Sequence, residues 1–93
     1  MAIQITAVRL EGGNTHEHIT RLKWYDPADG RIDDNSRAEI VAWIENQNGK
    51  AYVEDAQHHR VDVHVIAPYG RPKYLRTKAD GIETNNLLYL PRF

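Results

Sequence analysis

The chain has 93 residues, which is enough for one domain and too few for two. Its 12 basic and 13 acidic side chains leave a formal net charge of −1, without the basic excess typical of general polyanion binders. The absence of cysteine excludes disulfides, thiolate metal sites and cysteine nucleophiles. Because the sequence shows neither a signal peptide nor an apolar run of about 20 residues, we expect a cytoplasmic protein without a membrane partner.

The first half of the chain predicts two strands, over residues 3–10 and 17–25, paired as a hairpin. Leu22 and Trp24 share one face of the second strand and are expected to point inward. Residues 26–30, Asp-Pro-Ala-Asp-Gly, predict a turn, because proline presets one φ angle and glycine tolerates a positive one. We expect the acidic residues that follow to lie in a loop.

The clearest local signal is the start of a helix. Ser36-Arg37-Ala38-Glu39 fits a capping box, with Ser36 as N-cap and Glu39 as its reciprocal partner. A helix over residues 37–46 places three apolar side chains on one stripe: Ile40, Val41 and Ile44. Asn48-Gly49 then supplies a stop. A helix this short is marginal alone in water, so we expect its stripe to dock on the sheet.

The second half predicts three more strands, over residues 50–54, 60–66 and 73–77. Residues 60–66 alternate strictly between valine and polar side chains, which indicates one buried face and one wet face. Residues 85–91 resemble a single helical turn that ends at Pro91, after which Phe93 could fold back as an apolar latch. The prediction is therefore one α+β domain over residues 1–93, with a single antiparallel sheet of about five strands and one helix packed on one face.

The C-terminal third carries a longer pattern, Tyr-Leu-Arg-Thr-Lys-Ala-Asp-Gly over residues 74–81, then Asn-Asn-Leu over 85–87 and Leu-Pro-Arg-Phe over 90–93. This pattern resembles the signature of a bacterial and phage family catalogued as domain of unknown function 3892. The segments over residues 5–9 and 19–22 are similar to the opening hairpin of that family. The resemblance implies a small intracellular accessory domain of bacterial or viral origin, and it implies no activity, cofactor or ligand.

Catalytic machinery is not evident in the sequence. Ser36 is the only serine and already serves as a helix cap, and no phosphate-binding glycine motif is present. His16, His18 and His64 could hold a metal only if they met across the fold, since zinc needs three or four converging ligands. We therefore expect a protein that is not an enzyme and has no metal or cofactor. A small metal-dependent enzyme using these histidines is kept as an alternative.

Basic and aromatic side chains gather in two places. The candidate binding residues are Tyr69, Arg71, Lys73, Tyr74, Arg76 and Lys78, together with Arg21 and Lys23 on the second strand. If Leu75 points inward, Tyr74, Arg76 and Lys78 share the outward face. Tyrosines and guanidiniums on one sheet face suit single-stranded nucleic acids or nucleotides, but Lys and Arg also occur on ordinary solvated strands.

The leading hypothesis is a non-enzymatic binding or interaction module that contacts a protein partner, or a second copy of itself, through these residues. A nucleic-acid or nucleotide binder using the same basic and aromatic face is the main alternative.

Overall fold

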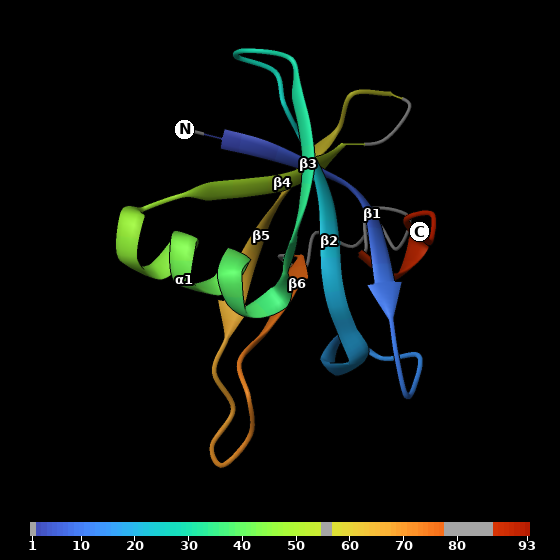
Figure 1. The fold of residues 1–93 in the computed structure, drawn as a ribbon, viewed down its shortest axis with the longest axis vertical. Helices are drawn as coiled ribbons and strands as arrows, with labels where there is room; N and C mark the ends of the chain where they lie inside the picture. The colour runs from blue at the N-terminus through green and yellow to red at the C-terminus, as the bar shows by residue number, and fades with distance from the viewer. Residues whose placement is uncertain (1, 55–56, 78–86) are drawn as a thin grey trace.

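The computed structural model describes residues 2–54, 57–77 and 87–93 (Figure 1). The elements in chain order are β1 (Ala2–Leu10), η1 (His16–His18), β2 (Ile19–Asp26), β3 (Arg31–Ser36), α1 (Arg37–Gln47), β4 (Lys50–Glu54), β5 (Arg60–Ile66), β6 (Tyr74–Thr77) and η3 (Leu87–Tyr89). The described residues thus form one sheet with one α-helix, which confirms the predicted α+β class.

The sheet differs from the prediction in two respects. It has six strands, in the order β3-β2-β1-β4-β5-β6, and it is mixed because β1 and β4 are parallel. Since β1, β2 and β3 follow one another as antiparallel neighbours, β3 runs in the direction of β1. Helix α1 then returns the chain to the start of β4, which runs parallel to β1, as a helical crossover allows. The predicted single sheet with one helix is confirmed, but the prediction that it is purely antiparallel was wrong, and it has one strand more than the five expected.

Strand β3 is the element that the sequence analysis missed, because its residues were expected to form a loop. Its sequence, Arg-Ile-Asp-Asp-Asn-Ser, has no run of alternating apolar side chains. It pairs along its whole length with β2, and polar contacts between the strands support the pairing. The Arg21 guanidinium donates to Asp34 Oδ1 at 2.9 and 2.6 Å, and Trp24 Nε1 donates to Asn35 Oδ1 at 2.8 Å. Pairing with β2 therefore makes a strand of a segment that has little strand character alone.

Strand β2 also begins later than predicted, at Ile19 instead of residue 17, because residues 16–18 form the 3₁₀ turn η1. The main-chain N–H of His18 donates to the carbonyl of Thr15 at 2.9 Å and closes this turn. The predicted hairpin of β1 and β2 is confirmed, with two register shifts along it. Leu22 and Trp24 both point inward, as expected.

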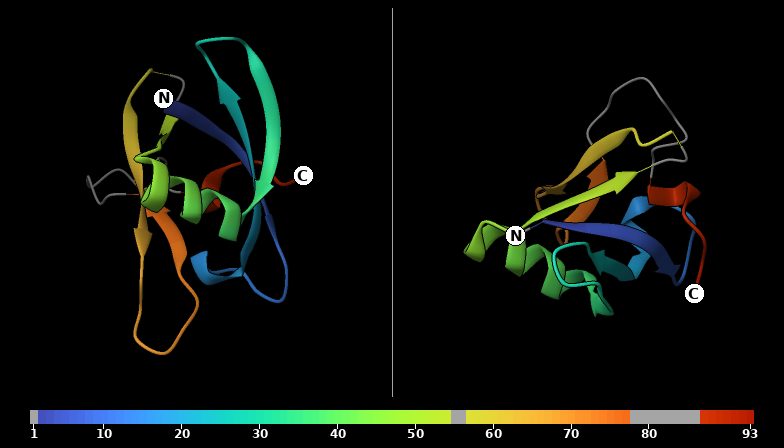
Figure 2. Two further views of the ribbon diagram at one scale, coloured as in Figure 1. Left: turned by 60° about the vertical axis from the view of Figure 1, so that its left-hand side comes forward. Right: turned by 90° about the horizontal axis from the view of Figure 1, so that it is seen from above.

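Helix α1 has the capping box that the sequence predicts. The Ser36 side chain accepts from the main-chain N–H of Glu39 at 3.2 Å, and Glu39 Oε1 accepts from the main-chain N–H of Ser36 at 3.0 Å. The helix contacts β2 and β3 toward one end of the sheet and β5 and β6 at the other. Figure 2 shows the consequence: the sheet is curled, and α1 lies across the gap between its two ends.

The hydrophobic core fills the inside of this curl. Ile40 and Val41 from the helix meet buried side chains of the strands, among them Ile5, Leu22 and Leu75, which have no exposed surface. Burial of this kind contributes roughly 1.5–3 kcal/mol for each large aliphatic side chain. Docking on the curled sheet therefore supplies the stability that an eleven-residue helix lacks by itself.

The C-terminal segment closes the fold against β1. Leu87 in η3 is fully buried in the core, which agrees with the helical turn predicted there. Beyond it, the main-chain N–H of Val8 donates to the carbonyl of Pro91 at 3.0 Å, and the N–H of Phe93 donates to the carbonyl of Val8 at 3.3 Å. The Arg9 guanidinium lies 4.8 Å from the centre of the Phe93 ring, so Phe93 does fold back onto the sheet. The first two residues of the predicted helical turn, 85 and 86, lie outside the described residues.

Candidate functional site

The eight candidate binding residues fall into two separate groups. Arg21 and Lys23 lie on β2, whereas Tyr69, Arg71, Lys73, Tyr74 and Arg76 lie on β6 and on the loop before it, and three strands separate β2 from β6 in the sheet order. Lys78 lies outside the described residues. The two described groups therefore lie on strands that are not neighbours in the sheet, although the curl of the sheet brings β6 against η1, which precedes β2.

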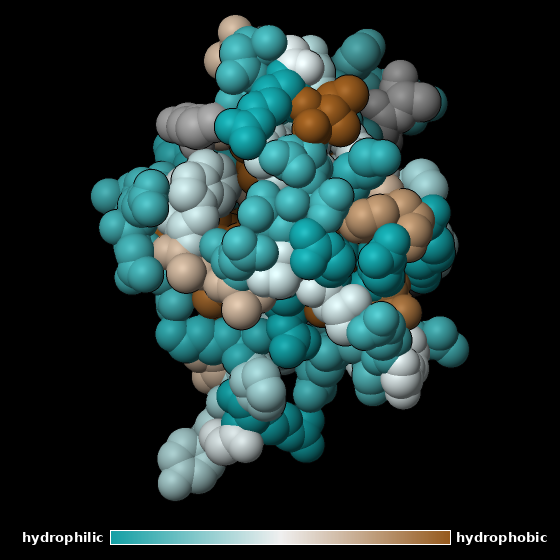
Figure 3. Space-filling model, in the orientation of Figure 1, coloured by the Kyte–Doolittle hydropathy of each residue, from teal (hydrophilic) through white to brown (hydrophobic). Residues whose placement is uncertain are grey.

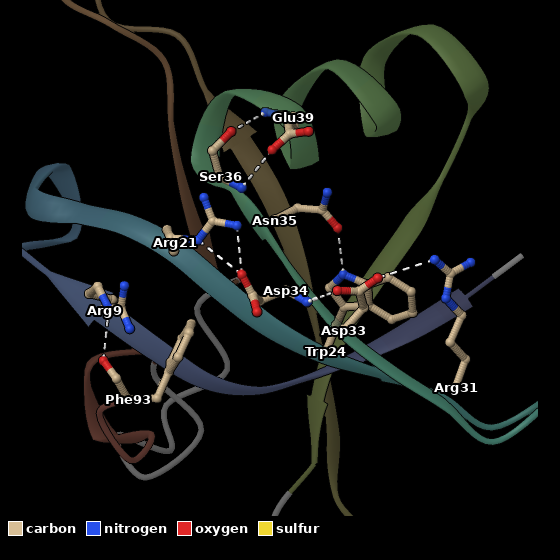
Figure 4. Close-up of polar contacts among 10 residues, drawn as sticks. All are labelled: Arg9, Arg21, Trp24, Arg31, Asp33, Asp34, Asn35, Ser36, Glu39 and Phe93. Carbon is tan, nitrogen blue, oxygen red and sulfur yellow. Dashed lines mark hydrogen bonds and ion pairs between the residues drawn. The ribbon is translucent and has the colours of Figure 1, made fainter.

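The β2 group is engaged within the protein. Figure 4 shows Arg21 bound to Asp34 of the neighbouring strand through two nitrogens. Lys23 places its Nζ 5.8 Å from the centre of the Phe93 ring. Both basic side chains are half-buried, and both have contacts that fasten one segment to another. Asp34 therefore neutralises Arg21, whereas Lys23 has an aromatic contact and keeps its charge.

The β6 group has the orientation that the sequence predicts. Leu75 has no exposed surface and points into the core, while Arg76 is exposed on the opposite face. Tyr74 shares that outer face and is half-buried. The neighbouring residues on β5 are His64, opposite Arg76, and Ile66, opposite Tyr74. This part of the face is accessible and mixed in character.

The loop over residues 67–73, between β5 and β6, projects from the body of the molecule (Figures 1 and 3). Its tip is a tight turn in which the N–H of Arg71 approaches the carbonyl of Pro68 at 3.4 Å. Gly70 has a φ of 73°, the positive value that type II turns require at their third position. Tyr69 therefore stands at the outermost corner of the turn, with a relative exposure of 104%.

Two ion pairs fasten the arm of the loop that leads back to β6. Arg71 Nη1 lies 3.3 Å from Glu17 Oε1 in η1, and Lys73 Nζ lies 2.8 Å from Glu45 Oε1 in α1. Each pair is exposed and contributes about 0.2–1 kcal/mol. Together they connect the returning arm of the loop to two different elements, η1 and α1.

A shallow groove of about 280 Å³ runs between this arm and α1. Its lining residues are Arg37, Ala38, Val41, Ala42, Glu45, Asn46, Pro72 and Lys73. The small side chains of the helix give the groove an apolar floor, and the Lys73–Glu45 pair crosses its rim. Tyr69 at the tip of the loop and the groove at its base are two features of the same loop, and we call them together the loop surface.

The histidines considered as metal ligands do not gather. His16 and His18 lie in the 3₁₀ turn η1, although the predicted second strand included His18, and the ring of His18 packs against Gly13 and bonds Thr15 Oγ1 at 2.8 Å. His64 lies on the exposed face of β5. Over residues 2–54, 57–77 and 87–93, no three histidine, aspartate or glutamate side chains are placed to hold a metal ion.

A second hollow, which the sequence analysis did not identify, lies between α1 and the inner side of β2 and β3. It has a volume of about 330 Å³ and is lined by Ile3, Trp24, Arg31, Asn35, Glu39, Ile40 and Trp43. Both tryptophans of the chain thus face one cavity. The one available signal was the pair of tryptophans, which became informative only after β3 and α1 were placed.

Charged groups at this cavity have defined partners (Figure 4). A hydrogen bond from the main-chain N–H of Ser36 lowers the pKa of Glu39. In the same way, the main-chain N–H of Asp34 donates to Asp33 Oδ1 and lowers the pKa of Asp33. Arg31 binds Asp33 Oδ2 at 3.1 Å and lies 5.6 Å from the centre of the Trp24 ring. Two carboxylates that remain ionised at neutral pH therefore accompany one guanidinium here.

The family described as "Protein of unknown function (DUF3892)" matches residues 4–91 of the chain. No curated protein and no solved structure matches it. The described helices are too short or too polar to cross a bilayer.

Proposed function

We propose that the chain, which belongs to the DUF3892 family of unknown function, is a non-enzymatic module. In this proposal it binds a protein partner through the loop surface and is an accessory protein of bacterial or phage origin. The sheet and helix serve as a frame that presents Tyr69 at the tip of the loop and the groove at its base.

The observation that carries the proposal is the complete exposure of Tyr69 on a fastened loop. A tyrosine that protrudes into water gains nothing for folding, yet its large amphipathic ring suits the centre of a protein interface. The turn at Gly70 and the two ion pairs restrict the loop before binding, which lowers the entropy lost when a partner docks. The apolar floor of the groove offers a partner further area to bury.

The charge pattern supports a protein partner over a nucleic acid. Arg21, Arg71 and Lys73 are each paired with a carboxylate. Among the described residues this leaves the exposed Arg76 and the half-buried Lys23 as candidate basic groups without an ion pair, and two such groups make a small contact area for a phosphate backbone. Nucleic-acid binders rely on unpaired basic groups that release counterions. This reasoning predicts no salt-dependent affinity for single-stranded DNA or RNA, which a filter-binding titration measures.

The test compares recovery of a specific bound protein by three tagged forms of the chain, expressed in its source organism. Tyr69→Ala should reduce recovery about 30-fold, as expected from a central interface residue that contributes about 2 kcal/mol or more. Tyr89→Ala is the matched control, because Tyr89 is also exposed, at 62%, but lies in η3 away from the loop. A second copy of the chain counts as a partner and would appear as a dimer in sedimentation. Equal recovery by wild type and Tyr69→Ala would contradict the proposal.

A further inference from the structure

We propose that the cavity between α1 and the β2–β3 hairpin binds an organic cation, an alkylammonium or guanidinium group, which stacks on the indole rings of Trp24 and Trp43 beside Glu39. This site is separate from the loop surface and does not depend on the proposed function. Helix residues Glu39, Ile40 and Trp43 line this cavity, whereas Ala38, Val41 and Ala42 line the groove at the loop.

The walls of the cavity have the chemistry that organic cations require. Trp24 reaches it from the inner side of β2 and Trp43 from α1, while Ile3 and Ile40 complete an apolar lining. Tryptophan has the most favourable ring face for a cation, and aromatic cages recognise quaternary ammonium groups in this way. A volume of about 330 Å³ is at the lower end of the range for small-ligand pockets and accommodates a compact headgroup.

The tryptophan walls are held in place by neighbouring contacts. Trp24 Nε1 donates to Asn35 Oδ1 at 2.8 Å, which fixes the plane of that indole. The ring of Trp43 packs directly on the backbone of Gly49, where an added Cβ atom would lie 2.3 Å from a ring atom. The cavity therefore has pre-formed walls that need no large rearrangement to admit a ligand.

The chain itself already places a cation against one of these rings. The Arg31 guanidinium lies 5.6 Å from the centre of the Trp24 ring at the edge of the cavity. Its side chain is 62% exposed, and its ion pair with Asp33, at 3.1 Å, is also solvent-exposed. Exposed contacts of this kind are weak and easily exchanged. We infer that Arg31 is a stand-in for the external cation and is displaced when that cation binds.

The negative charge comes from Glu39. The capping box holds its carboxylate, since Oε1 accepts from the main-chain N–H of Ser36 at 3.0 Å. The same contact keeps the pKa of Glu39 below its ordinary value, so the group is ionised at neutral pH. Asp33 adds a second carboxylate beside Arg31. With the neighbouring Arg21–Asp34 pair included, three carboxylates stand against two guanidiniums, and this excess of negative charge favours a cation over an anion.

Intrinsic fluorescence gives a direct test, because both tryptophans of the chain line the cavity. The probe is choline chloride, titrated at constant ionic strength, with 3,3-dimethylbutan-1-ol as its uncharged carbon analogue. We expect saturable quenching by choline and affinity for the alcohol that is about 2- to 30-fold weaker, the range set by cation–π attraction. Equal affinities, or no saturable change with choline in either wild type or Arg31→Ala, would overturn the proposal.

Two variants then separate the roles of the charged groups. Glu39→Gln preserves the capping box, which accepts glutamine as well as glutamate, but removes the charge, so choline affinity should fall about two- to fivefold. Arg31→Ala should raise choline affinity by a similar factor because the competing guanidinium is gone. Weaker binding by Arg31→Ala would show that Arg31 is itself a ligand-binding group and would refute its role as a stand-in. Tyr69→Ala should bind choline as wild type does, which keeps this test independent of the loop surface.

Discussion

Replacing Gly49 with alanine tests how the structure positions Trp43. Gly49 is buried, follows the C-cap residue Asn48 of the helix and has no positive φ, so the backbone there accepts alanine. The added carbon would lie 2.3 Å from the Trp43 ring, far inside the ordinary contact distance, and the indole would have to move by more than 1 Å. Overpacking of this kind costs about 1–3 kcal/mol. For a domain of this size, the melting temperature should fall by about 4 to 24 °C.

Circular dichroism during thermal unfolding measures the fall in melting temperature, and tryptophan fluorescence reports the displacement of the Trp43 ring. Gly30→Ala is a useful control, because that glycine has a φ of 77° and a Cβ atom added there would meet nothing within 4 Å. It should lose stability through backbone strain alone, about 1–2 kcal/mol, without changing the fluorescence.

The double variant Gly49→Ala with Trp43→Ala, together with the two single variants, forms a double-mutant cycle. If the cost of Gly49→Ala arises from the indole, it should largely vanish when Trp43 is already alanine, which gives a coupling energy of about 1 kcal/mol or more. Additive effects of the two substitutions would refute this explanation of why the position requires glycine.

Three further predictions concern stability. Ser36→Ala removes the N-cap of α1 and should lower the free energy of unfolding by about 1 kcal/mol in urea denaturation, whereas Ser36→Thr should retain most of it. Leu75→Ala empties a fully buried site beneath the outer face of β6 and should cost about 2–5 kcal/mol; a cost below about 1 kcal/mol would place Leu75 outside the core. Hydrogen bonds from Arg60 and then His58 lower the pKa of Glu54 below its ordinary value of 4.5, so the stability they supply is present above that value and is lost as the pH falls below it. The stability difference between wild type and Glu54→Gln should therefore shrink on acidification below about pH 4.5, and a difference independent of pH would contradict this.

The elements that could be predicted are those whose signals are local. The capping box of Ser36 and Glu39 spans four residues and forms its hydrogen bonds wherever the helix docks. The alternation over residues 60–66 likewise matches β5, with Val61 and Val63 buried. In each case the sequence pattern and the tertiary environment favour the same structure.

The elements that were missed depend on partners distant in the sequence. Strand β3 has little β propensity of its own and forms because β2 offers Arg21 and Trp24 to its polar side chains. The parallel contact of β1 with β4 depends on where α1 returns the chain, which no local pattern encodes.

In the candidate site, too, features with a local signal could be predicted and features that depend on distant residues could not. Tyr69 could be identified from the cluster of basic and aromatic residues, and its exposure follows from the turn at Gly70. The acids that pair with Arg71 and Lys73 could not be identified from the sequence, because Glu17 lies 54 residues from Arg71 and Glu45 lies 28 residues from Lys73. The tryptophan cavity could not be predicted either, because residues of β3 form part of its lining.

The most direct measurement for the central claim is site-specific photo-crosslinking in the source organism. A benzophenone amino acid replaces Tyr69 in one form of the protein and Tyr89 in another, so that both probes are exposed aromatics. Contact through the loop surface predicts a discrete adduct from position 69, at twice the monomer mass for a second copy or at another mass for a different protein, and none from position 89. No adduct at position 69, or the same adduct from both positions, would contradict it.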